Sequence, residues 1–156
     1  MQPFRFHSIY QPRIWGGQSM RTMLGRELPD RETAYGEAWE ISDRPEAMSI
    51  VKDGEWEGMP LHRLWEEHRQ EIFGPGYERF PRFPLLCKIL DARENLSVQV
   101  HPPERTAAAQ QGEVKNEIWY VLHASPDALI YGGMEENATL PDIRHAAETG
   151  QMEQLI

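Results

Sequence analysis

The sequence predicts a mainly β fold, a barrel or sandwich of short strands with a few short helices inserted. Three observations lead to this prediction. Most apolar residues fall in runs of strand length, and several of these runs alternate with polar residues. Twelve prolines and twelve glycines are spread along the 156 residues, as turns between many short elements require. Only one long segment has clear helical spacing, and the total length corresponds to one domain.

The N-terminal third is expected to consist of strands joined by turns. Its predicted elements are a strand at 4–10, a turn at the Trp-Gly-Gly of 15–17, a short helix at 21–25, and strands at 37–42 and 47–54. Gly25 is a helix-ending residue, and Asp53 followed by Gly54 is a turn signal that closes the last of these strands.

The clearest helix is predicted at 59–74. Its apolar face is formed by residues at helical spacing, namely Leu61, Leu64, Trp65, His68 and Ile72. Pro60 lies near its start and Gly74 at its end, which are the positions that these two residue types prefer.

Strands are again expected in the second half. Strands at 83–92 and 96–102 would pair around a turn at 93–95, and a short helix or loop follows at 103–112. Two more strands are predicted at 116–124 and 127–134, and the tail, 139–156, is helical with a break near Gly150.

Composition limits the classes of partner and the compartment. The formal net charge of −9, from 25 acidic and 16 basic residues, argues against nucleic acid and anionic membranes but is compatible with a small anionic substrate. The single cysteine, Cys87, rules out an internal disulfide, suits a reducing compartment and is expected in the core. The first residues contain no uninterrupted apolar run, so we expect neither a signal peptide nor a membrane span, and a cytoplasmic location.

The stretch "LSVQVHP" places polar side chains on one face of its predicted strand. Ser97, Gln99 and His101 alternate with apolar neighbours, so they share a face. The pattern by itself favours an ordinary half-wet strand. The alternative is that this face lines an enclosed site and that Gln99 and His101 are ligands.

Lys115 and Glu117 form a second polar pair, two residues apart at the start of a run that is apolar on both faces. A simple ion pair on one face of a strand is one interpretation. Taken with Gln99 and His101, however, Glu117 completes a set of amide, imidazole and carboxylate donors. Such a mixed set suits a divalent cation with an open coordination position, in the manner of catalytic zinc.

The motifs "WGG", "GEAWEIS", "FPLLCKILDARENLSVQVHP" and "KNEIWYVL" resemble those of the type I mannose-6-phosphate isomerases (phosphomannose isomerases) in their short bacterial form. The similarity extends from residue 10 to the end, and the segment 88–120 is its most specific part. The resemblance implies a cupin-like (jelly-roll) barrel and a zinc-dependent enzyme that interconverts mannose 6-phosphate and fructose 6-phosphate.

The resemblance also assigns roles to individual residues. It implies that Gln99, His101 and Glu117 bind one Zn²⁺, or another divalent cation, and that Lys115 is an acid/base or substrate-contacting group. Ser97 and Lys88 would contact the sugar phosphate. Apart from the resemblance, Glu37 is a candidate for the pocket mouth, although a structural ion pair explains it at least as well, and Arg13 is a candidate pocket cation. A metal on the substrate oxygens would stabilise the charge of a cis-enediol while a nearby base moves the proton between C1 and C2.

Two expected parts of the family's site have no counterpart in this sequence. The family's fourth ligand, a histidine, and its phosphate-binding arginine lie in segments beyond residue 156, and neither His123 nor His145 occupies the corresponding motif. The chain, 1–156, is therefore interpreted as the N-terminal portion of a single domain with an incomplete barrel.

Three interpretations follow from this difference. A partial isomerase is favoured, because Lys115 beside Glu117 indicates catalytic ancestry, although the activity of this chain by itself stays open. A second copy of the chain could complete the barrel as a homodimer. A non-catalytic metal- or sugar-binding cupin module is the alternative from a different functional class.

Overall fold

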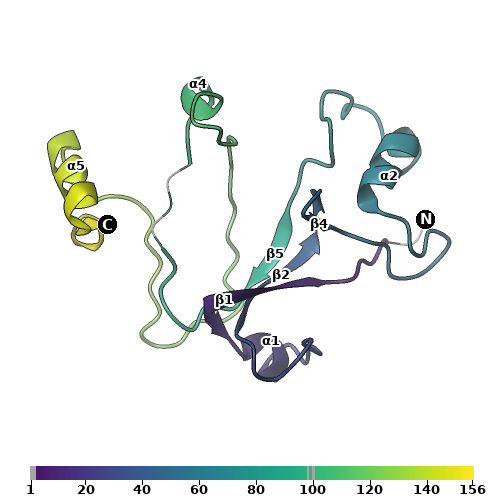
Figure 1. Cartoon of the computed structure of the whole chain (residues 1–156), viewed down its shortest axis with the longest axis horizontal. Coiled ribbons are helices and arrows are strands. Elements are labelled where there is room, and N and C mark those ends of the chain that lie inside the picture. The colour runs from purple at the N-terminus through teal and green to yellow at the C-terminus, as the bar shows by residue number, and fades with distance from the viewer. Residues whose placement is uncertain (1–2, 98, 100) are drawn as a thin grey trace. The chain divides into compact units, whose positions relative to one another are not determined.

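A computed structural model of the chain describes residues 3–97, 99 and 101–156. The chain forms two compact units, residues 1–96 and residues 97–156, which we describe separately. The first unit contains all the strands of the described residues, and the second contains two helices and a 3-10 turn connected by long extended segments (Figure 1). The mainly β character is therefore confirmed in the first unit.

The first unit is built on a three-stranded antiparallel sheet of order β1-β2-β5, with a separate two-stranded hairpin β3-β4. The strands are β1 (Ile9–Gly17), β2 (Tyr35–Ile41), β3 (Asp43–Arg44), β4 (Ala47–Met48) and β5 (Cys87–Leu90). In the central strand Glu37 lies between Gln11 of β1 and Leu90 of β5, and Trp39 is paired with Lys88. This register decides which side chains meet at the candidate site.

The predicted turn at 15–17 is wrong, because β1 continues through it. The register of β1 against β2 shifts between Pro12 and Gly17, and these irregularities absorb the extra residues. Gly36 permits the close approach, since a Cβ there would lie 2.5 Å from the Trp15 ring and 2.6 Å from the Arg13 Cβ. The predicted strand at 4–10 is regular only from Ile9 onward.

The predicted helix at 59–74 is present as two helices, α2 (Leu61–Glu67) and α3 (Arg69–Phe73), after a one-turn α1 (Ser19–Thr22). The break is at His68, whose φ of −126° is not helical. The predicted apolar face is correct in α2, where Trp65 is 1% exposed. Its indole packs against three aromatic rings, those of Phe73, Tyr77 and Phe83, and these contacts attach α2 and α3 to the segment that precedes β5.

A smaller core lies against the sheet. Met20, Tyr35 and Ala38 are buried there, with Tyr10 and Ile89 partly buried beside them. Cys87 does not join this core: it is exposed at the start of β5, contrary to the prediction. Alternation along an edge strand turns every second side chain outward, and the sequence does not reveal which set faces the core.

The second unit contains α4 (Glu104–Ala107), α5 (Leu140–Thr149) and the 3-10 turn η1 (Met152–Gln154). The predicted helical tail is confirmed, including its break at Gly150, which adopts a left-handed conformation with φ of 70°. Thr139 and Asp142 form a reciprocal capping box at the start of α5. No helix in the described part of the chain is long and apolar enough to cross a membrane.

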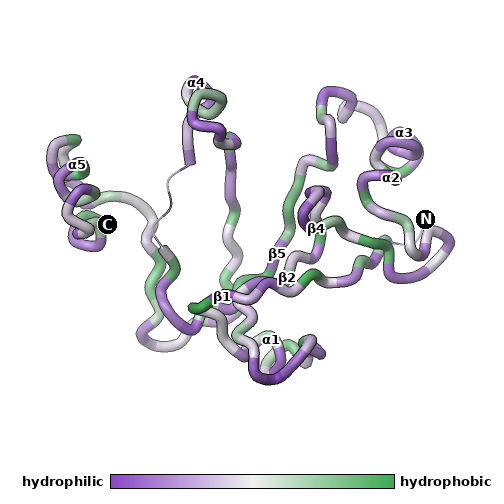
Figure 2. Tube along the Cα trace, in the orientation of Figure 1, coloured by the Kyte–Doolittle hydropathy of each residue, from purple (hydrophilic) through white to green (hydrophobic). Residues whose placement is uncertain are grey.

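The predicted strands at 116–124 and 127–134 are not formed. This segment is extended and carries exposed apolar side chains, with Ile118 98% and Tyr120 86% exposed, and apolar stretches are visible along the trace between α4 and α5 (Figure 2). A strand that is apolar on both faces needs neighbouring strands and covering layers, and the described residues of the second unit form none.

The strand predicted at 96–102 is not assigned where the structure describes it, and Val98 and Val100 lie outside the described residues. Together with the absence of strands in the described residues of the second unit, this means that the described residues form no closed barrel.

Candidate functional site

The second unit brings three of the predicted site residues together. The Lys115 ammonium lies 2.5 Å from one carboxylate oxygen of Glu117, as expected for residues two apart in an extended segment. The His101 Nε2 lies 3.6 Å from the other oxygen of the same carboxylate. Each of the three side chains is about one-third exposed, at 35%, 33% and 32% in this order. Glu117 therefore joins a cation on one side to an imidazole on the other.

The spacing of His101 and Glu117 fits a shared metal ion. Two ligands of a tetrahedral zinc with bond lengths of about 2.1 Å lie about 3.4 Å apart. The observed Nε2–Oε2 separation of 3.6 Å is close to that value, so both atoms can reach one ion with little movement. Among the described residues no cluster of three His, Cys, Asp or Glu side chains could hold a metal ion. The predicted ligand set of Gln99, His101 and Glu117 contains only two residues of these four types.

Gln99 and Ser97 form a neighbouring pair in the same unit. The Gln99 amide Nε2 donates a long hydrogen bond of 3.4 Å to the Ser97 hydroxyl. The two side chains are thus in contact, although the described residues form no strand here. The amide oxygen of Gln99 is the donor atom that the predicted ligand set requires.

Lys88, the sixth predicted site residue, belongs to the first unit and is bound there to Glu37. Its ammonium lies 3.1 Å from one oxygen of the Glu37 carboxylate. The other oxygen accepts hydrogen bonds from the Arg13 guanidinium at 2.8 Å and from the Trp39 indole at 2.9 Å. Glu37 is 6% exposed, so two cations and an indole N–H compensate a buried carboxylate.

The electrostatics of Glu37 follow from this arrangement. Burial raises the pKa of the Glu37 carboxyl, but the hydrogen bonds from Trp39 and Lys88 and the charges of Lys88 and Arg13 outweigh it and hold the pKa below its ordinary value. Glu37 is therefore a stable anion that orients Lys88. Sequence reasoning had considered an ion pair for Glu37 but did not identify its partner, because the pairing depends on the register of β2 with β5.

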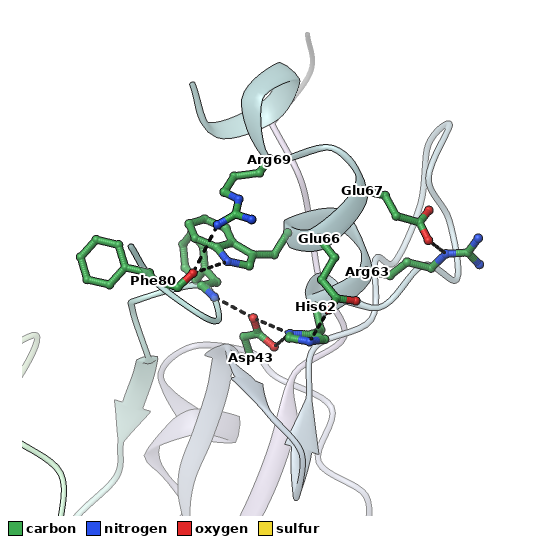
Figure 3. A network of polar contacts seen from close by, with 9 residues as sticks. Asp43, His62, Arg63, Glu66, Glu67, Arg69 and Phe80 are labelled. Carbon is green, nitrogen blue, oxygen red and sulfur yellow. Dashed lines mark hydrogen bonds and ion pairs between the residues drawn. The ribbon is translucent and has the colours of Figure 1, made fainter. Parts of the chain in front are cut away.

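A second buried carboxylate in the first unit has a structural role that the sequence did not reveal. Asp43, on β3, accepts hydrogen bonds from the Phe83 backbone N–H at 2.7 Å and from the His62 Nδ1 at 2.9 Å (Figure 3). His62 Nε2 in turn lies 3.5 Å from Glu66. This network connects the β3-β4 hairpin to α2 and to the segment that leads into β5, and so supports the strand that carries Lys88.

Comparison with known proteins identifies relatives over nearly the whole chain. The family model "Phosphomannose isomerase type I, catalytic domain" matches residues 3–126. The mannose-6-phosphate isomerase of Streptococcus mutans is 40% identical over 99% of this chain and 48% of its own length. The mannose-6-phosphate isomerase ManA of Bacillus subtilis is 38% identical, with the same two coverages of 99% and 48%.

A solved structure resembles the chain as well. The crystal structure of the mannose 6-phosphate isomerase from Bacillus subtilis superposes with a TM-score of 0.63 at 37% identity, covering 71% of this chain and 34% of that chain. The chain spans about half the length of the curated relatives that it matches, at 48% of each.

Proposed function

The chain belongs to the type I phosphomannose isomerase family, and on that premise we propose that it supplies the metal-binding half of a mannose-6-phosphate isomerase. The reaction is the interconversion of mannose 6-phosphate and fructose 6-phosphate through a cis-enediol. The observation that carries the proposal is the contact of His101 and Lys115 with opposite oxygens of Glu117, at 3.6 and 2.5 Å.

Gln99, His101 and Glu117 would hold one Zn²⁺ per chain. They supply an amide oxygen, an imidazole nitrogen and a carboxylate oxygen, a donor set without thiolate that leaves room for further ligands. A bound zinc ion supplies Lewis-acid stabilisation of negative charge on the substrate oxygens. Because one Glu117 oxygen faces His101 and the other holds Lys115, the carboxylate can bind the ion and still orient the lysine.

Lys115 is the group that we assign to proton transfer or to contact with the reacting carbons. Its ion pair with Glu117 fixes the ammonium beside the proposed metal ligands. The reaction moves a proton between C1 and C2, so a group capable of giving and taking a proton must lie within hydrogen-bonding reach of those atoms.

Lys88 and Ser97 are proposed to contact the sugar phosphate. Lys88 is held in place by the Glu37 carboxylate, and an ammonium group has three donors, so it can also bind phosphate or hydroxyl oxygens. The Ser97 hydroxyl accepts from Gln99, and a hydroxyl that accepts one hydrogen bond can also donate one to a ligand oxygen.

We further propose that a second copy of the chain completes the family's cupin-type barrel. The exposed apolar segment that contains Ile118 and Tyr120 supports this proposal, since extended segments with apolar side chains on both faces are stable only when neighbouring strands cover them.

Conversion of mannose 6-phosphate in D₂O tests the proposed reaction. The zinc-supplemented chain, combined with the other half of a relative, should produce fructose 6-phosphate, and deuterium should enter at the carbon that receives the proton, because the enediol exchanges with solvent. Lys115→Met should lower the rate by about 10²-fold or more. Arg63→Gln is the matched control, since this exposed cation pairs with Glu67 on α2.

Two results would contradict the proposal. Conversion that survives Lys115→Met unchanged would remove Lys115 from the chemistry. Metal binding without any conversion, even after the other half of a relative is added, would favour a non-catalytic metal- or sugar-binding cupin module.

A further inference from the structure

A pocket of about 400 Å³ lies in the first unit, outside the residues to which the proposed function assigns a role. Its wall is formed by three segments: the N-terminal segment with the start of β1, the loop after α1, and Lys52, which follows the isolated bridge residue Val51. The residues that line the pocket are Phe6, His7, Ser8, Tyr10, Arg26, Glu27 and Lys52. Its volume is at the lower end of the range for small-molecule sites.

Arg26 is held in position at this wall. One guanidinium nitrogen, Nη1, lies 2.9 Å from the Glu40 carboxylate and donates to the Ser8 hydroxyl at 2.9 Å. The Ser8 hydroxyl also donates to Glu40, at 3.1 Å. Arg26 and Glu40 are only 28% and 24% exposed, so this arrangement is largely protected from water. An arginine has five N–H donors, and the contacts with Ser8 and Glu40 use Nη1 alone.

Lys52 forms no ion pair within the described residues, and the Glu27 carboxylate lines the same pocket. The adjacent acid, Asp53, is bound instead by Arg5 at 2.6 Å, and the acid nearest to Arg26 is bound by Arg26 itself. The backbone N–H of Lys52 donates to the Arg5 carbonyl at 2.8 Å, which fixes the start of the lysine side chain at the pocket edge. Two cationic side chains thus approach one pocket from different segments.

The rest of the lining adds hydroxyl partners and an apolar wall. Glu27 contributes a carboxylate to the pocket wall. This carboxylate can accept hydrogen bonds from the hydroxyl groups of a ligand, and it repels an anion that carries no hydroxyl group. Phe6 and Tyr10 supply aromatic surface, and the Tyr10 ring is fixed edge-on against Tyr35 with 5.8 Å between centroids. Cations, one acceptor and aromatic faces together match a compact ligand that carries both phosphate and hydroxyl groups.

We infer that this pocket is a second binding site for a small phosphorylated sugar, distinct from the residues proposed for catalysis. Arg26 and Lys52 bind the phosphate, Glu27 accepts from ring hydroxyls, and the Phe6 and Tyr10 rings cover the apolar edge of the sugar. The choice of mannose 6-phosphate as the first probe rests on the proposed function. The pocket and the charges of its lining residues are independent of that function.

The histidine resonances of the intact, zinc-supplemented chain can separate the two sites in one titration at fixed pH. His7 lines the pocket, whereas His101 reports on the proposed metal centre, and His7→Gln and His101→Gln assign the two signals. Mannose 6-phosphate should shift the His7 signal saturably. Mannose and inorganic phosphate should each need about tenfold more ligand, because each lacks one half of the contacts.

Variants then test the assigned contacts. Lys52→Gln should weaken the mannose 6-phosphate effect on His7 about tenfold and leave the His101 response unchanged. Arg63→Gln, which removes an exposed cation away from the pocket, should change neither response. A shift of the His101 signal without a shift of the His7 signal would overturn this inference and leave the proposed function standing. A shift of the His7 signal alone would support the second site and contradict the proposed function. Equal responses to inorganic phosphate and to mannose 6-phosphate would reduce the pocket to a nonspecific anion contact and would also overturn the inference.

Discussion

Glu37 is the buried carboxylate on which the polar contacts of the central sheet converge. Removing its charge leaves Arg13 and Lys88 without their anion and the Trp39 indole with a weaker acceptor. Buried charge networks lose more when one member is removed than the pair contributes in isolation, because the remaining groups stay desolvated.

Glu37→Gln is therefore expected to lower the free energy of unfolding by about 1–3 kcal/mol, measured by urea denaturation. Asp53→Asn is the matched control, because its pair with Arg5 is exposed, at 38% and 72%, and should contribute under about 1 kcal/mol. Equal effects of the two substitutions would contradict the account of Glu37.

Asp30 gives the pH dependence of stability a defined window. Hydrogen bonds from the Thr33 backbone N–H and the Tyr35 hydroxyl lower the pKa of Asp30 from 3.8 to about 2. Since the folded pKa is the lower one, the stabilisation is fully present above the unfolded value and is lost as the pH falls from about 4 toward 2. Asp30→Asn should remove this part of the dependence, as seen by comparing unfolding free energies of both proteins between pH 2 and pH 6. Parallel curves for the two proteins would show that Asp30 does not contribute.

At the scale of elements, sequence patterns correctly predicted the helices and strands that depend on contacts between residues close together in the sequence. The apolar face of 59–74 is present in α2, and the C-terminal helix and β2 are also present. The predicted helix broke at His68, where the side chain packs edge-on against the Trp56 ring, a contact that periodicity does not reveal. Strands at 116–134 could not be predicted reliably, because a strand requires a partner from elsewhere in the chain or assembly.

The contact between β1 and β2 makes a specific prediction at this scale. Gly36→Ala places a Cβ 2.5 Å from the Trp15 ring, so the strands must separate, and the free energy of unfolding should fall by about 1–3 kcal/mol. Gly133→Ala is the control, since no atom lies within 4 Å of a Cβ there. Chemical denaturation measures both. An unchanged stability for Gly36→Ala would show that β1 and β2 are less closely packed than described.

The candidate site shows the same division between local and non-local information. Lys115 contacts Glu117, as both the ion-pair and the ligand interpretation expect, and His101 lies beside the same carboxylate. Other contacts depend on how distant segments meet, which no short sequence pattern reveals. The ion pair of Lys88 with Glu37 depends on strand register, and the contact of buried Asp43 with His62 depends on how α2 packs.

At the scale of the whole molecule, the exposed apolar segment of the second unit predicts self-association of the chain. Ile118 is 98% exposed, so Ile118→Lys should change the stability of the monomer by no more than about 0.5 kcal/mol. The same substitution should reduce self-association, measured by sedimentation velocity over a range of concentrations, because it places a charge in the apolar surface. A parent chain that stays monomeric at all concentrations would contradict completion of the barrel by a second copy.

The central claim is that Gln99, His101 and Glu117 bind a metal ion, and zinc content of the purified chain tests it most directly. The parent should contain about one zinc per chain, and Gln99→Ala, His101→Ala and Glu117→Ala should each lose most of it, because three donors are the minimum for a catalytic site. Ser97→Ala should retain the metal. A parent without zinc, or variants that bind it as well as the parent does, would contradict the account.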